Sequence, residues 1–144
     1  MSNKVLFDDN IHDLRKLYYT SWQAYRLNKP LSALEKHVAA VIIDHPEYQP
    51  LFEHEGGLYQ QFEIDNDENN PFLHMGLHLA LREQIMTDRP AGIRTIFTTL
   101  SLKQPTLTVE HGMMACLKKC LHAAQREKQE PDEAAYINAL QHLL

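Results

Sequence analysis

Apolar residues recur every three or four positions along almost the whole chain, and prolines divide this pattern into segments. That spacing places apolar side chains on one face of an α-helix. No segment shows the sustained alternation of apolar and polar residues that is typical of a half-buried strand. The helices predicted from the spacing cover about residues 8–28, 32–45, 71–88, 90–104, 108–128 and 131–144. We therefore predict an all-α fold, a single compact bundle of five to six helices that forms one domain over residues 1–144.

The segment over about residues 71–88 is apolar on every side, and we predict that it is the buried central helix of the bundle. Asn70 suits the N-cap, and Pro71 suits the first helical position, where its missing N–H is not needed. Within the ten residues that follow Pro71, the only polar side chains are His74 and His78. These two histidines lie four residues apart, so they share one face of the helix.

The sequence also predicts one helix cap and one short helical turn. Ser32 and Glu35 form a capping-box pattern, in which the serine accepts from the glutamate N–H and the glutamate reaches back to the serine N–H. Residues 46–53 can form only a short helical turn, which Gly56 and Gly57 are expected to end.

Residues 58–70 are acidic, and we predict an irregular loop in which Tyr59, Phe62 and Ile64 anchor the chain to the core. The acidic spacing that begins at Asp65 is similar to the start of a calcium-binding loop. However, the sixth position of that spacing is not glycine and the twelfth is not glutamate, so a calcium site is not expected.

Composition and charge exclude several classes of protein. The chain has 144 residues, 23% of them charged, and a formal net charge of −5 without a cluster of lysine and arginine, so no nucleic-acid partner is expected. No apolar run approaches the roughly 20 residues of a membrane span, and no signal peptide is recognised. Cys116 and Cys120 lie one predicted helical turn apart, which is poor disulfide geometry. These features predict a reduced, cytoplasmic protein with no membrane partner.

The histidine pair on the central helix is the main candidate for chemistry. His74 and His78 could bind one zinc ion, or another divalent transition metal, through their imidazole nitrogens. His111 is the preferred third ligand because it stands in the first turn of its predicted helix, although its distance from the apolar face predicts exposure. His45 or His37 could replace it.

Two other interpretations of the same residues stay open. Cys116 and Cys120 could complete a His₂Cys₂ metal set, or they could be small core residues. Alternatively, His74 and His78 are neutral, structural histidines, each hydrogen-bonded to a tyrosine, to a backbone carbonyl or to a carboxylate such as Glu47 or Glu35. A buried polar group requires such a partner.

Several motifs resemble an uncharacterised proteobacterial family, catalogued as domain of unknown function 1841. The motifs are residues 70–84 with 88–94, Trp22 with Tyr25, residues 45–48, residues 111–114, Cys116 with Leu117, and residues 125–126. This resemblance implies a bacterial protein and draws attention to His74, His78 and His111, but the family has no assigned activity. Family members often carry an acidic residue where this chain has Ala115, a difference that counts against a metal site shared through that residue.

The sequence contains no complete catalytic set. There is no glycine-rich phosphate loop, no GxSxG nucleophile elbow and no paired-carboxylate motif, so neither catalytic nor cofactor-binding residues are assigned. The prediction is therefore a non-catalytic interaction module with structural histidines, which binds an unidentified protein partner. The alternative is a metal-binding helical enzyme or sensor that uses His74 and His78.

Overall fold

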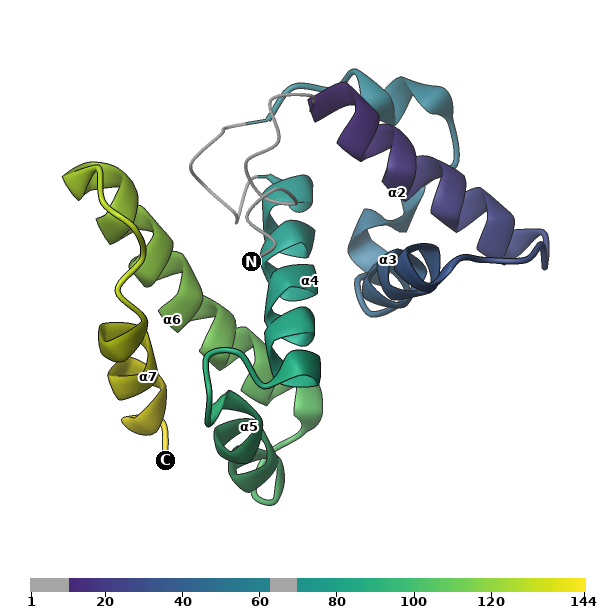
Figure 1. Cartoon of the computed structure of the whole chain (residues 1–144). Helices are drawn as coiled ribbons and strands as arrows, with labels where there is room; N and C mark the ends of the chain where they lie inside the picture. Colours follow the sequence, from purple (N-terminus) through teal and green to yellow (C-terminus); the bar gives the residue numbers. More distant parts are fainter. Residues whose placement is uncertain (1–10, 63–69) are drawn as a thin grey trace. The chain divides into compact units, whose positions relative to one another are not determined.

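The computed structural model describes residues 11–62 and 70–144, and every regular element within these two stretches is helical (Figure 1). The elements are α2 (Ile11–Arg26), α3 (Ala33–Ile43), the 3-10 turns η1 (Pro46–Phe52) and η2 (Glu55–Leu58), α4 (Pro71–Thr87), α5 (Ile93–Ser101), α6 (Thr106–Glu127) and α7 (Glu133–Gln141). The predicted all-α class is confirmed. The start predicted for the first helix and the acidic spacing from Asp65 lie outside the described residues.

The chain divides into two compact units, Met1–Leu79 and Ala80–Leu144, and α4 continues from one into the other. A single domain over residues 1–144, and a central position for α4 within it, stay predictions. Each unit is considered by itself below.

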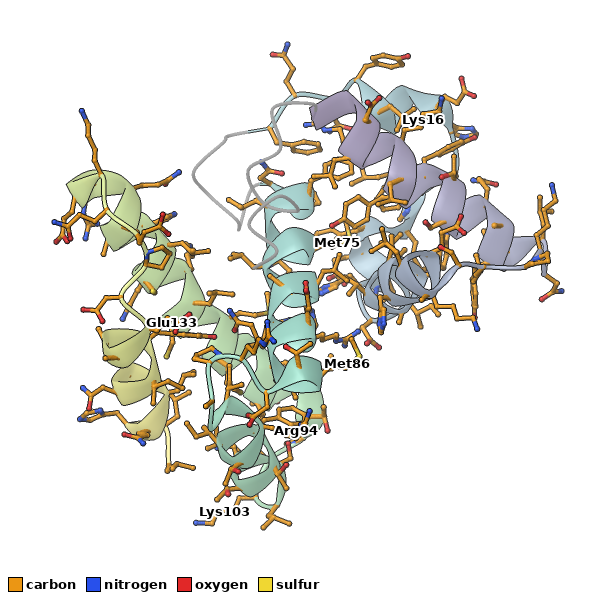
Figure 2. The ribbon with its side chains drawn as sticks, viewed as in Figure 1. Lys16, Met75, Met86, Arg94, Lys103 and Glu133 are labelled. Carbon is orange, nitrogen blue, oxygen red and sulfur yellow. The ribbon has the colours of Figure 1, made fainter. Side chains whose placement is uncertain are left out.

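In the first unit α2 packs against α3, and both helices contact η1 (Figure 1). Tyr18 lies at the centre of the core, where its ring centroid is 6.3 Å from that of Phe52 and 5.8 Å from that of Phe72. The other buried members of this core are Trp22, Val38, Val41, Ile42, Met75 and Leu79. Met75 is labelled on α4 in Figure 2. Two elements that are separated along the chain, α2 and the start of α4, therefore share one apolar core.

Of the three residues predicted to anchor the acidic loop to the core, one is confirmed and one is wrong. Phe62 packs against the core of the first unit, as predicted. Tyr59 is 69% exposed, so its prediction as an anchor is wrong, and Ile64 lies outside the described residues. Tyr59 immediately follows η2, where Leu58 takes the buried position instead.

The two glycines do not end the turn that begins at Pro46. That turn, η1, ends at Phe52, and Gly56 and Gly57 lie inside η2, so the predicted role of the glycines is wrong. A Cβ atom at Gly57 would lie only 2.1 Å from the carbonyl oxygen of Leu51. Glycine is therefore needed at residue 57 because the two turns approach closely, rather than to stop a helix.

Local capping follows the sequence pattern in both places where it was predicted. Ser32 and Glu35 form the reciprocal capping box at 2.8 and 3.2 Å. At the start of α4, Oδ1 of Asn70 accepts from the backbone N–H groups of Phe72 and Leu73 at 3.1 and 3.2 Å. Both helix starts are thus specified by polar side chains close in sequence.

Removing the Asn70 side chain tests this cap. We expect Asn70→Ala to lower the free energy of unfolding by about 1 kcal/mol, because two N–H groups at the start of α4 lose their acceptor. Asn70→Ser, which retains a capping oxygen, should recover most of the loss. Urea denaturation followed by circular dichroism measures both variants, and equal stability of the alanine and serine variants would contradict the capping role.

The second unit begins with the last turns of α4, which are closed by residues from the following turn. Asp88 adopts a positive φ of 52° directly after α4, and its Oδ1 accepts from the backbone N–H groups of Gly92 and Arg94. The Arg94 guanidinium donates to the carbonyl oxygens of Ile85 and Met86. Unpaired carbonyls at the C-terminus of a helix favour a cationic donor of this kind.

Helices α5, α6 and α7 pack against one another to form the rest of the second unit (Figure 1). Tyr136 is buried, and its hydroxyl donates to Oε1 of Gln84 at 2.7 Å. The buried apolar residues of this unit include Leu81, Ile93, Ile96, Leu100, Met113, Leu117, Leu121 and Leu140.

Cys116 and Cys120, which one interpretation of the sequence took as small core residues, are only partly buried. Both line a cavity between α6 and α7, so this part of the α6 surface is partly open.

Candidate metal centre

His45 occupies the junction between α3 and η1, and it is held there by its neighbours in sequence. Pro46 follows it and begins η1, and the His45 side chain is only 2% exposed. Its Nδ1 lies 2.9 Å from Oε1 of Glu47, and its ring stacks on Tyr48 with centroids 5.2 Å apart. The segment His-Pro-Glu-Tyr thus fixes both the position and the orientation of one imidazole.

Helix α4 brings two further imidazoles to His45. Nδ1 of His78, which is fully buried, lies 2.9 Å from Nε2 of His45. His74, one helical turn earlier and partly exposed, presents its ring edge-on to His45 with centroids 4.8 Å apart. These three residues, His45, His74 and His78, are called the histidine cluster below. All three belong to the first unit.

The Glu47 carboxylate determines which ring nitrogen of His45 carries the proton. Burial raises the pKa of Glu47, but hydrogen bonds from its own backbone N–H and from His45 outweigh this and hold its pKa below the ordinary value. Glu47 is therefore an ionised acceptor, and Nδ1–H of His45 donates to it. In neutral His45 the lone pair then lies on Nε2, the atom directed at His78.

This arrangement has the features of a metal-binding histidine. Ligating histidines usually donate their second ring N–H to a carboxylate, which fixes the tautomer and the ring orientation. Two nitrogens bound to one tetrahedral zinc ion at 2.0–2.1 Å lie roughly 3.3 Å apart. The separation of 2.9 Å between His45 and His78 is close to that value, so a small movement would place an ion between them.

The structure brings two of the three predicted ligands together with an alternative third one. The predicted pair His74 and His78 lies against His45, one of the two alternatives considered for the third ligand. His111 is an exposed residue of α6 in the second unit, so its exposure was correctly predicted and its role as a ligand stays a prediction. His37, the other alternative, is partly buried on α3. The His₂Cys₂ set also stays a prediction.

Sequence reasoning did not recognise the pairing of Glu47 with His45. Glu47 was considered only as a hydrogen-bond partner for His74 or His78, whereas it bonds to His45 two residues before it. The signal was the tetrapeptide at residues 45–48, in which a proline stops α3 and begins a tight turn. His45 precedes η1 with a non-helical backbone, and its side chain meets that of Glu47, a contact that a helical pattern does not predict.

Comparison with known proteins identifies a family but no characterised relative. A family model described as Domain of unknown function (DUF1841) matches residues 10–142. No curated protein and no solved structure matches the chain. Among the described helices, none has the length and apolar character needed to cross a membrane.

Proposed function

We propose that this chain, which belongs to the family described as Domain of unknown function (DUF1841), binds one divalent transition-metal ion at its histidine cluster. The observation that carries the proposal is the approach of Nε2 of His45 to Nδ1 of His78, with Glu47 behind the first ring and His74 beside it. Imidazole nitrogens are donors that Zn²⁺ and similar ions prefer.

Each residue has a distinct role in this proposal. His45 binds through Nε2, since Glu47 holds its Nδ1–H. His78 binds through Nδ1 and transfers its proton to the opposite nitrogen of the ring. His74 is partly exposed, so the ion reaches the cluster from its side. Three protein ligands leave a fourth position for water. His111, the third ligand predicted from the sequence, stays a prediction.

Structural histidines are the competing interpretation. A hydrogen bond from His78 to His45, and one from His45 to Glu47, would satisfy three ring nitrogens without any metal. What favours the metal is that a third imidazole, that of His74, presents its edge to His45 with ring centroids 4.8 Å apart. The interaction module predicted from the sequence remains a prediction, and it requires no metal.

Metal analysis of the untagged protein, purified without chelators, tests the proposal. We expect near-stoichiometric transition metal in the natural chain and none in the His45→Ala/His78→Ala variant, as measured by mass spectrometry of the elements. His54→Ala is the matched control, because His54 is an exposed histidine of the same unit. A folded natural chain that neither retains metal nor binds added Zn²⁺ or Co²⁺ would overturn the proposal.

The carboxylate behind His45 provides a finer test. We expect Glu47→Gln to weaken metal affinity by roughly 10–100-fold, the usual effect of removing a carboxylate that orients a ligating histidine. Glu53→Gln, at an exposed glutamate that caps the end of η1, should leave affinity unchanged. Competition titration with a metal-binding dye measures both, and equal affinities would show that Glu47 does not orient a ligand. Measuring His111→Ala in the same assay tests His111, which the sequence predicted as the third ligand.

A further inference from the structure

The second unit contains a cavity that the histidine cluster does not involve. It has a volume of about 260 Å³ and lies between α6 and α7. Both cysteines of the chain line it, together with small side chains such as Ala123 and Ala139 and the ring of Tyr136. The only two thiols of the protein thus open into one space.

The Cys120 thiol also contacts the connection between α6 and α7. Sγ of Cys120 donates to the backbone oxygen of Asp132 at 3.8 Å. Burial raises the pKa of Tyr136, and the charges that Cys116 and Cys120 would carry as thiolates raise it further. Cys116 and Cys120 are each partly buried, which leaves both sulfur atoms within reach of a small ion that enters the cavity.

The geometry of the pair excludes a disulfide and suits a bridging ion. Residues four apart on a helix have Cβ atoms about 5–6 Å from each other, whereas a disulfide requires about 3.5–4.5 Å. An ion bound to sulfur at about 2.3 Å can span the wider gap. Among the described residues, no histidine or carboxylate joins the two sulfurs to form a group of three possible ligands. The site therefore offers two thiolates and no more.

We propose that Cys116 and Cys120 bind one Cu(I) ion in this cavity, as a two-coordinate bis-thiolate. Thiolates are soft ligands that both Cu(I) and Zn²⁺ prefer, but Cu(I) accepts two ligands whereas Zn²⁺ usually takes four. Binding converts two thiols and one Cu⁺ into a complex of charge −1 and releases two protons to solvent. Lys119, which also lines the cavity, partly compensates that charge.

The surrounding charges favour a cation over free thiolates. Burial raises the pKa of both thiols, and the carboxylates of Asp132 and Glu133 (the latter labelled in Figure 2) raise that of Cys120 further. The thiols are therefore protonated at neutral pH and poor nucleophiles. A soft cation that replaces the two protons lowers the charge of the ionised pair from −2 to −1, and so reduces the repulsion that opposes ionisation.

Anaerobic titration with Cu(I) in competition with a colorimetric Cu(I) chelator tests this site. The titration uses the His45→Ala/His78→Ala background, so that the histidine cluster binds no ion. A failure of the proposed cysteine site is then distinguishable from a failure of the proposed histidine site. We expect one Cu(I) per chain in this background, and loss of that ion in both Cys116→Ser and Cys120→Ser. Serine preserves the size of the side chain but removes the soft ligand. Ala123→Ser, which adds a hydroxyl to the same cavity, should retain the ion.

X-ray absorption at the copper edge provides a second measurement. Two sulfur neighbours are expected in the loaded protein, and circular dichroism shows whether each serine variant is folded. Cu(I) that remains bound in a folded Cys120→Ser variant would overturn the proposal. So would tighter binding of Zn²⁺ than of Cu(I) at the cysteine pair, because it would require ligands beyond the two thiolates.

Discussion

Arg82→Met is expected to lower the free energy of unfolding of the second unit by about 3 kcal/mol. Glu110 is buried, with 6% of its side chain exposed. The Arg82 guanidinium donates two hydrogen bonds of 3.1 Å to its carboxylate. Removing one member of a buried ion pair typically costs about 3–5 kcal/mol, because the other charge stays buried without its partner. We expect a cost at the lower end of this range because 21% of the Arg82 side chain is exposed.

The double variant Arg82→Met/Glu110→Leu distinguishes loss of the pair from loss of packing. With both charges of the pair replaced by apolar groups, the buried Glu110 carboxylate is no longer present, so the double variant should be more stable than Arg82→Met alone. Arg89→Met, at an exposed arginine of the same unit, is the control. Urea denaturation measures all three. A loss below about 1 kcal/mol for Arg82→Met would place the pair among ordinary surface ion pairs.

Features that depend on a few neighbouring residues were predictable from the sequence. The capping box at Ser32 and the cap at Asn70 both occur where the pattern placed them. Each depends on a polar side chain that reaches a backbone N–H within one turn, so spacing alone carries the information. The helical class follows in the same way from the spacing of apolar residues.

Features that depend on contacts between distant segments were not predictable. Nothing in the local sequence shows that the carbonyl of Leu51 approaches Gly57, or that α7 leaves a cavity over Cys116 and Cys120. A helical pattern identifies an apolar face, but it does not state how much of that face a neighbour covers. The sequence therefore allowed Cys116 and Cys120 to be interpreted as core residues, although they line a cavity.

The candidate site likewise combines a local feature that the sequence predicts with contacts between distant segments that it does not predict. The spacing of His74 and His78 placed them on one face of one helix, and they do lie one turn apart on α4. His45 could be considered only as one of several alternatives, because its distance from α4 depends on how α3 and η1 pack. The orientation of its ring depends in turn on Glu47, which no helical pattern could have indicated.

The second large effect is expected at Phe52, which connects the core to the candidate site. Phe52 is 1% exposed and packs against Tyr18 and Phe72, and its carbonyl accepts from the Gln23 side chain. It is the last residue of η1, the turn that begins directly after His45. We expect Phe52→Ala to lower the free energy of unfolding by about 3–5 kcal/mol, as for other buried phenylalanines.

Phe52→Ala should also weaken metal binding in the protein that remains folded. Without its anchor, η1 can move, and the positions of His45 and Glu47 at its start are no longer fixed against α4. Tyr18→Phe is the matched control: it keeps an aromatic ring in the same core and removes a hydroxyl that has no hydrogen-bond partner among the described residues. It should change stability by less than about 1 kcal/mol, since no hydrogen bond is lost. Thermal unfolding and metal titration of both variants measure the two effects. If Phe52→Ala lost stability but kept its metal affinity, η1 would not be the element that holds His45 in place.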